Sequence, residues 1–238
     1  MNYFEARKIS QDYYQTYQLP AYLKNIIQNL PKNARILDFG CGFGQILFAI
    51  KELENNDKKK RGGGYQLTGI DIDAKAIDFC QKCGLNAQKI EDIFYYEPLE
   101  KFDLIIMTHV LEHFPKDKII SLLEHFKRTF LKPNAKIFIA VPNAQSHTGC
   151  YWAYEDFTHQ TLFTAGSLHY VLKMSGFNQI DFIDIDCTYG TKWPTKIIRK
   201  IFLNLYRIKM KFWNLITASS FHQPSPEIYS YEIKVIAS

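Results

Sequence analysis

The stretch that decides the fold is Arg35-Ile36-Leu37-Asp38-Phe39-Gly40-Cys41-Gly42-Phe43-Gly44, an apolar run that passes directly into a turn with three glycines. A helical pattern follows over residues 45–54. Glycine has no Cβ, so its backbone approaches a bound molecule more closely than that of any other residue. A strand, a glycine turn and a helix in this order are typical of a nucleotide-like cofactor at the switch point of a doubly wound sheet.

The glycine spacing and one acid indicate which cofactor this is. Dinucleotide-binding loops read G-x-G-x-x-G, whereas here Gln45 occupies the sixth position and the third glycine comes one place early. Asp38 would repel a pyrophosphate but attract an ammonium or sulfonium group, and S-adenosyl-L-methionine carries both cations. We therefore predict this cofactor, with S-adenosyl-L-homocysteine as its product, and disfavour an NAD(P) oxidoreductase. The predicted loop contacts are Asp38, Gly40, Cys41, Gly42 and Gly44.

Two further acids follow the next two apolar runs. Asp71 ends the second run, at the point where an acid accepts hydrogen bonds from the two ribose hydroxyls of a nucleoside. Asp92, favoured over Glu91, follows the third run and is expected to accept from the adenine amino group. Ile72 and Ile93 are expected to sandwich the adenine ring.

Seven short apolar runs alternate with helical patterns along the chain, at residues 34–39, 66–72, 85–90, 102–108, 135–141, 178–186 and 229–237. Helix-length stretches separate the first five runs, which predicts parallel strands with helices on both faces of the sheet. The last two runs are joined by a long connection, which indicates an antiparallel strand at the edge. The predicted fold is α/β, a doubly wound, mostly parallel seven-stranded sheet with an antiparallel last strand.

Five motifs in order resemble one family, the class I, Rossmann-like S-adenosylmethionine-dependent methyltransferases. They are ILDFGCGFGQIL (36–47), GIDID (69–73), IEDI (90–93), FDLIIMTHVLEHF (102–114) and LKPNAKIFIAVPN (131–143). The resemblance implies the same seven-stranded sheet, and a backbone around Met107 and Thr108 that lies near the amino acid part of the cofactor. The shorter block Asp156-Phe157-Thr158-His159 resembles a subgroup of these enzymes that modifies sugars and polysaccharides.

A second motif, His109-Val110-Leu111-Glu112-His113, matches the H-x-x-E-H signature of one class of zinc proteases. Such a site needs both histidines one turn apart on a continuous helix and a third ligand further on. Here the motif directly follows a buried strand, and Pro115 interrupts the helix. We therefore expect no metal site, either here or at the single C-x-x-C pair of Cys80 and Cys83.

The segment 154–164 follows the fifth strand, on the side where acceptors bind in folds of this kind. An unperturbed imidazole has a pKa near 6.5 and takes up a proton near neutral pH, so His159 is the candidate base for a hydroxyl acceptor. Asp156, three residues earlier, is expected to orient it. The alternative is a histidine that only anchors the loop, and His109, His113 and His147 are the other candidates.

The predicted activity is O-methylation of a sugar, a glycan or a lipid-linked precursor by an S-adenosylmethionine-dependent methyltransferase. Methylation of a quinone-type or other small molecule is the first alternative. A catalytically silent protein of the same fold, which binds the cofactor or a partner, is the second.

Positive charge is concentrated near the C-terminus. The 238 residues contain 29 Lys and Arg and 24 Asp and Glu, a net charge of +5, yet residues 187–226 hold seven bases and no acid. Apolar residues recur at helical spacing within 196–216, which predicts a basic amphipathic helix. This helix either contacts an anionic membrane surface or packs on the sheet with its basic side in water. We expect no nucleic acid partner, because the charge is not spread over the whole domain.

We expect one domain over residues 1–238, with a helical N-terminal cap over 1–33 and the basic insertion over 187–226. The N-terminus lacks the apolar core of a signal peptide, and no stretch approaches the about 18 apolar residues of a membrane span. Five scattered cysteines do not resemble a disulfide framework. These features predict a cytoplasmic protein, with peripheral contact at the inner membrane face as a further expectation.

Overall fold

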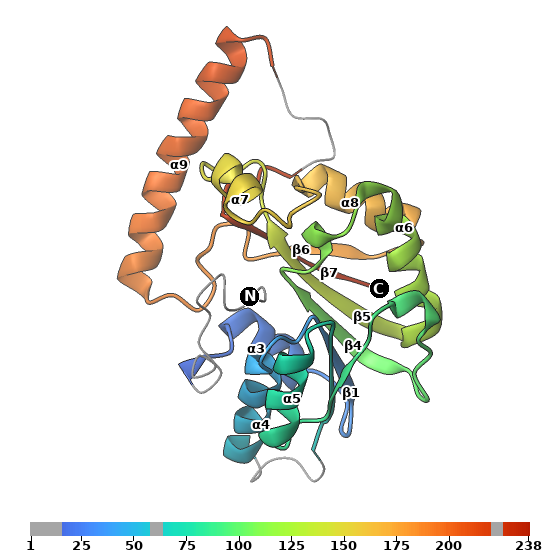
Figure 1. Ribbon diagram of the computed structural model, residues 1–238. Coiled ribbons are helices and arrows are strands. Elements are labelled where there is room, and N and C mark those ends of the chain that lie inside the picture. The colour runs from blue at the N-terminus through green and yellow to red at the C-terminus, as the bar shows by residue number, and fades with distance from the viewer. Residues whose placement is uncertain (1–15, 58–63, 220–225) are drawn as a thin grey trace. The chain divides into compact units, whose positions relative to one another are not determined.

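A computed structural model describes residues 16–57, 64–219 and 226–238, and its strands form one sheet with the order β3-β2-β1-β4-β5-β7-β6 (Figure 1). β1 pairs in parallel with β2 and β4, β2 pairs in parallel with β3, and β6 and β7 are antiparallel. The predicted seven-stranded, mostly parallel sheet is confirmed. The strands are β1 (Arg35–Phe39), β2 (Gln66–Asp71), β3 (Ala87–Lys89), β4 (Phe102–Thr108), β5 (Leu131–Pro142), β6 (Ile180–Ile183) and β7 (Glu232–Ala237).

Helices fill the connections between the strands. The α-helices are α3 (Ala21–Gln28), α4 (Gln45–Asp57), α5 (Ala74–Lys82), α6 (Lys116–His125), α7 (Gly149–Glu155), α8 (Ala165–Met174) and α9 (Trp193–Ile216). Shorter turns are the 3₁₀ helices η1 (Ile93–Tyr95) and η2 (Leu111–His113) and the π-helical η3 (Phe126–Phe130). The chain divides into two compact units: unit 1 comprises Met1–Thr108 and Arg128–Ile137, and unit 2 comprises His109–Lys127 and Phe138–Ser238.

The core of unit 1 is built on β1 and β4, whose central apolar side chains are fully buried. Figure 1 shows α4 and α5 beside the strands of this unit. Gly69 of β2 lets α4 and the glycine loop pack this closely, because a Cβ there would lie 2.7 Å from Leu47 Cδ1 and 2.8 Å from Cys41 Sγ. The register pairs Asp38 with Gly69, which places the acid at the end of β1 beside this close contact.

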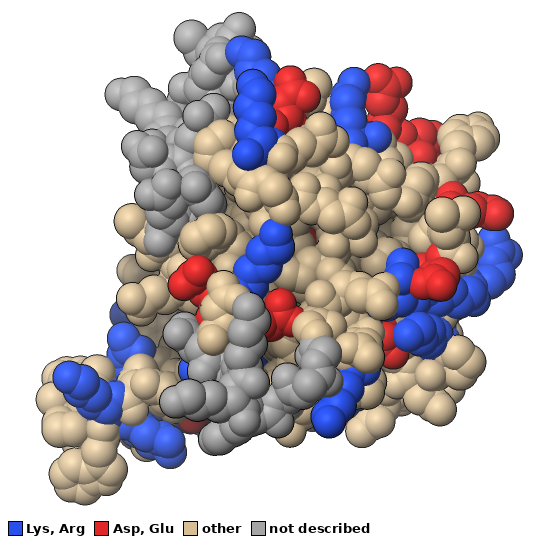
Figure 2. All heavy atoms as spheres, turned by 90° about the horizontal axis from the view of Figure 1, so that it is seen from below, with Lys and Arg blue, Asp and Glu red and all other residues tan. Residues whose placement is uncertain are grey.

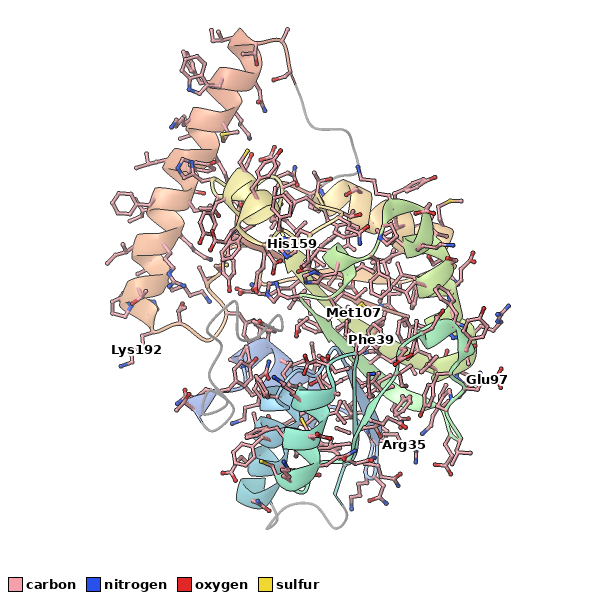
Figure 3. The ribbon with its side chains drawn as sticks, viewed as in Figure 1. Arg35, Phe39, Glu97, Met107, His159 and Lys192 are labelled. Carbon is pink, nitrogen blue, oxygen red and sulfur yellow. The ribbon has the colours of Figure 1, made fainter. Side chains whose placement is uncertain are left out.

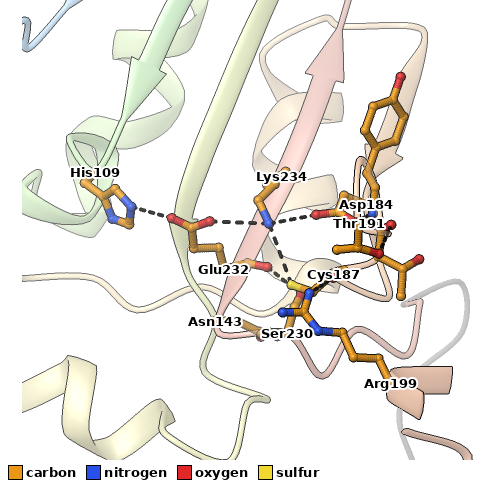
Figure 4. Close-up of polar contacts among 11 residues, drawn as sticks. His109, Asn143, Asp184, Cys187, Thr191, Arg199, Ser230, Glu232 and Lys234 are labelled. Carbon is orange, nitrogen blue, oxygen red and sulfur yellow. Dashed lines mark hydrogen bonds and ion pairs between the residues drawn. The ribbon is translucent and has the colours of Figure 1, made fainter. Parts of the chain in front are cut away.

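In unit 2 the last strand, β7, is antiparallel to β6, as predicted. β7 lies between β5 and β6, and β6 forms the edge. The reason is burial: five of the six residues of β7 are buried, whereas no residue of β6 is. The interior strand tolerates two charged residues because Glu232 and Lys234 lie 3.3 Å apart, and Lys234 also lies 3.4 Å from Asp184 (Figure 4).

Candidate cofactor and acceptor sites

The glycine loop between β1 and α4 adopts a conformation that favours glycine at three positions. Gly40, Gly42 and Gly44 have φ angles of 78°, 51° and 79°, in the left-handed region. The amides of Gly40 and Cys41 both donate to the carbonyl of Ile70, over 2.8 and 3.0 Å. The sequence indicated glycine for close approach to a ligand, and the structure adds that the backbone itself requires it.

Asp71, at the end of β2, connects this strand to the glycine loop. Its Oδ2 accepts from the amide of Gly42 over 2.8 Å, and its Oδ1 accepts from the amide of Asp73 over 2.9 Å. Burial of the carboxyl raises its pKa, and these amide bonds partly offset the effect. Each carboxylate oxygen can accept a second bond, so the group is able to hold the loop and to receive hydroxyl donors.

Asp38 is the buried acid of this site. It is 1% exposed, and within the described residues neither of its oxygens accepts a hydrogen bond. Burial, with the charge of Asp71 as a second cause, raises the pKa of Asp38 to about 8. Two carboxyls in this arrangement oppose a pyrophosphate and would be stabilised by a cation. The residues present therefore fit S-adenosylmethionine and do not fit a dinucleotide.

The other predicted cofactor residues of unit 1 differ in their exposure and in their hydrogen bonds. Asp92 caps η1 by accepting from the amide of Phe94 over 2.9 Å. Ile72 is 72% exposed, whereas Ile93 is almost fully buried, so Ile72 presents the larger apolar surface to a ring. Met107 is buried and is the register partner of Phe39 (Figure 3), and Thr108 ends β4 beside it.

Cys41 takes part in the glycine loop through its backbone amide, and its thiol is buried in the core. Its side chain packs with Leu47 and Cys80 in the core of unit 1. The contact with Cys80, together with burial, raises the pKa of the Cys41 thiol, which keeps it protonated and unreactive.

On the acceptor side, the loop between α7 and α8 holds His159 (Figure 3). Its Nδ1 lies 2.7 Å from the carbonyl oxygen of Trp152. A carbonyl only accepts hydrogen bonds, so Nδ1 carries the proton and Nε2 of the neutral ring keeps its lone pair. That Nε2 lies 3.9 Å from Oε1 of Glu112.

Asp156 takes part in a different contact from the one expected. Its Oδ1 accepts from the amide of Thr158 over 3.0 Å and from its hydroxyl over 2.6 Å. The same hydroxyl oxygen lies 2.8 Å from Nδ1 of His113. Asp156 therefore orients His113 through Thr158, while the carbonyl of Trp152 orients His159.

Glu112 is a further candidate site residue, which was not among the residues predicted to be catalytic. The short turn η2 follows His109, whose φ of 55° is left-handed, and it carries Glu112 into the interior, where the residue is 0% exposed. Within the described residues neither carboxylate oxygen accepts a hydrogen bond. One carboxylate oxygen of Glu112 and one ring nitrogen each of His113 and His159, atoms that could bind a metal ion, all lie within 4.8 Å of one another. The sequence signal for Glu112 and His113 was the H-x-x-E-H motif, whereas their proximity to His159 was visible only in the structure.

His109 belongs to a charged chain that runs to β7 (Figure 4). Its Nε2 lies 2.7 Å from Oε1 of Glu232, and its Nδ1 lies 3.3 Å from Oε1 of Glu112. Desolvation of the ring favours the neutral form, but the contacts with Glu112 and Glu232 outweigh it and raise the pKa of His109 to about 10. The ring is therefore cationic near neutral pH, which argues against His109 as a proton acceptor.

His147, the remaining histidine candidate, lies apart from these contacts. It is exposed, and its ring centroid lies 6.5 Å from that of Tyr206.

Comparisons with known proteins agree with this fold. The family model described as a methyltransferase domain matches residues 11–181. A crystal structure of a SAM-dependent methyltransferase from Archaeoglobus fulgidus is 22% identical, with a TM-score of 0.63 and coverage of 99% of this chain and 97% of that one.

Two curated relatives match over about half of this chain. The proposed methyltransferase YqeM of Bacillus subtilis is 27% identical over 50% of this chain and 47% of its own length. A proposed pentatricopeptide repeat-containing protein of Arabidopsis thaliana is 32% identical over 49% of this chain and 17% of its own length. The chain thus spans less than half of the length of these two relatives.

Proposed function

Because the chain belongs to the family of methyltransferase domains, we propose that it transfers the methyl group of S-adenosylmethionine to a hydroxyl oxygen of a sugar or glycan acceptor. The observation that carries the choice of oxygen is the fixed imidazole lone pair at Nε2 of His159. Attack by a hydroxyl forms a carbon–oxygen bond, breaks a carbon–sulfur bond and releases the hydroxyl proton, which needs an acceptor.

The bound cofactor supplies an electrophilic methyl group on a positively charged sulfur. Asp71 holds the ribose hydroxyls, Asp92 accepts from the adenine amino group and Ile72 covers the ring. Asp38 balances the positive charge, since its unbonded carboxyl lacks any other partner in the described residues. The backbone at Met107 and Thr108 lies along the amino acid part, as the family resemblance implies.

On the acceptor side, the cluster of Glu112, His113 and His159 acts on the hydroxyl. The negative charge of the Glu112 carboxylate and the imidazole lone pairs of the two histidines favour loss of the hydroxyl proton. Exposed aromatic side chains on and after α7 offer flat apolar surfaces to a sugar ring. They are Tyr151, Tyr154 and Phe157, which are 52%, 78% and 97% exposed.

The test is an acceptor screen by mass spectrometry with nucleotide sugars, lipid-linked glycans and quinone precursors. We expect a gain of one methyl group on a sugar hydroxyl. His159→Ala is expected to lower turnover by about 10²–10⁴-fold with cofactor affinity unchanged, and His147→Ala, an exposed histidine outside the cluster, is the matched control. Methylation at nitrogen or carbon, or undiminished turnover in His159→Ala, would contradict the proposal.

The basic helix α9 is present, but its apolar side does not pack inward. None of its 24 residues is buried. The apolar residues at helical spacing are all exposed, from 38% at Ile197 to 79% at Leu215; they are Ile197, Ile201, Leu205, Ile208, Phe212 and Leu215. Other side chains of α9 contact the rest of unit 2: Tyr206 makes an edge-to-face contact with Tyr229, and Arg207 pairs with Asp186 over 2.7 Å.

We propose that this outward side of α9 lies on an anionic lipid surface. The helix carries the exposed residues Lys196, Lys200 and Lys211, and the segment around it, residues 187–226, contains no acid. This distribution of charge suits negatively charged headgroups. Elsewhere, Figure 2 shows basic and acidic side chains interspersed over the face that it presents. Among the described residues, no helix has the length and apolar character to cross a membrane.

Sedimentation with vesicles of phosphatidylcholine and phosphatidylglycerol tests the α9 surface. Each base near the surface contributes about 1 kcal/mol, so removing Lys196, Lys200 and Lys211 together should weaken binding about 100-fold. The control removes three exposed lysines elsewhere, Lys24, Lys82 and Lys116. A stable dimer in solution that buries α9, or equal binding to pure phosphatidylcholine, would overturn the membrane proposal.

A further inference from the structure

We propose that Glu112, His113 and His159 form a binding site for a divalent transition-metal ion. This departs from our expectation of no metal, which rested on the lack of a continuous helix through the H-x-x-E-H motif. The motif indeed forms a 3₁₀ turn. The third ligand that the motif lacked comes from His159, 46 residues after His113, and the ligand-type atoms of the three residues lie within 4.8 Å of one another.

The two segments that carry these residues are joined by backbone hydrogen bonds. The amides of Gln160 and Thr161 both donate to the carbonyl of Glu112, over 2.9 and 3.0 Å. The side-chain amide of Gln160 donates to the carbonyl of His113 over 2.9 Å. The three side chains are therefore held together by the chain itself, as a metal site requires before its ion binds.

Both histidines are held in the form that binds metals. Metal-ligating imidazoles usually donate their other ring N–H to a carbonyl or a carboxylate, which fixes the tautomer. His159 does this through the carbonyl of Trp152. The Thr158 hydroxyl gives its proton to Asp156, so its oxygen accepts from Nδ1 of His113, and Nε2 of His113 keeps the lone pair.

The third residue supplies the negative charge. Glu112 is completely buried and within the described residues accepts no hydrogen bond, an arrangement that is costly for a carboxylate. Among the described residues, Nδ1 of His109 lies 3.3 Å and Nε2 of His159 lies 3.9 Å from Oε1 of Glu112. A divalent cation among these groups would satisfy the carboxylate directly.

The ligand chemistry selects the kind of ion. Two imidazole nitrogens and one carboxylate oxygen suit zinc, cobalt or iron, whereas magnesium prefers oxygen ligands alone. Three protein ligands leave a position open for a further oxygen. Resting on the proposed function, that open position would take the acceptor hydroxyl, and the ion would lower the pKa of this hydroxyl. The Nε2 lone pair of His159 would then act through the ion, and the released proton would pass to water.

Titration of the whole protein with Co²⁺, followed by its visible absorption, tests the site without cofactor or acceptor. We expect one Co²⁺ per chain, displaced by Zn²⁺ and not by Mg²⁺. His113→Ala and Glu112→Gln should each abolish the spectrum. Thr158→Val, which removes only the hydroxyl that orients His113, should weaken Co²⁺ binding about 10–100-fold. This graded loss separates ligands from a positioning residue.

Two controls address other histidines and thiols. His147→Ala, an exposed histidine of the same unit, should bind Co²⁺ as the unmodified protein does. Cys83→Ser should also leave the spectrum unchanged, because the ligands are nitrogen and oxygen. A spectrum that survives in His113→Ala would overturn the metal site. So would an unmodified protein that is folded, as its thermal melting shows, and yet binds no Co²⁺. The titration measures Co²⁺ binding and not methyl transfer. A failure of the metal site and a failure of the proposed activity can therefore be told apart.

Discussion

Replacing Asp71 with alanine is expected to lower the affinity for S-adenosylmethionine by about 10²–10⁴-fold. A hydrogen bond from a neutral donor to a carboxylate contributes about 1.5–3 kcal/mol, and two ribose hydroxyls would lose theirs. The variant also frees the amide of Gly42, which Asp71 holds over 2.8 Å, so the glycine loop loses its anchor. Calorimetric titration measures the loss.

The control and a second ligand separate the two roles of Asp71. Asp78→Ala removes an exposed acid from the neighbouring helix and should leave the affinity unchanged. A 2′,3′-dideoxy analogue of S-adenosylhomocysteine should bind the unmodified protein poorly and lose little more in Asp71→Ala. If the analogue instead loses as much as the natural ligand does, Asp71 anchors the loop and does not contact the ribose.

Asp38→Asn is expected to stabilise the cofactor-free protein near pH 8 and to remove most of its affinity for the cofactor. The pKa of Asp38 is raised to about 8 in the folded chain, from an ordinary value of 3.8, by burial and then by the charge of Asp71. Between these two values the folded state holds a proton that the unfolded state has lost. The free energy of unfolding therefore falls by about 1.4 kcal/mol per pH unit as the pH rises, and this loss ends near pH 8.

An asparagine carries no such proton, so the two proteins should differ in how their stability responds to pH. Their melting temperatures should approach each other near pH 4, and the variant should melt higher at pH 8. Cofactor affinity should rise with pH in the unmodified protein, because Asp38 must ionise to balance a cation, and should stay flat in the variant. Parallel melting curves from pH 4 to pH 8 would show that Asp38 ionises normally. Asp78→Asn serves as the exposed control.

The strand, the glycine turn and the helix that frame the predicted cofactor site were predictable from sequence because their residues belong to short contiguous motifs. A strand that runs into a glycine turn restricts the backbone locally, so the sequence alone indicates that Asp38 and Asp71 lie at the ends of two strands beside the loop glycines. The acceptor side was predictable only in part. His159 was identified by its chemistry, but its orienting partner is the carbonyl of Trp152 rather than Asp156. That choice depends on how the α7–α8 loop folds.

By itself, the sequence determined the α/β class, the seven strands and the cofactor type, since apolar periodicity and motif spacing are local properties of the chain. Only the tertiary structure decided the interior place of β7, the outward apolar side of α9 and the cluster of Glu112, His113 and His159. Each of these depends on contacts between residues far apart in sequence. Burial and hydrogen bonding across such distances are set by the packed chain as a whole, and a short motif such as H-x-x-E-H supplies only two of the three residues of the cluster.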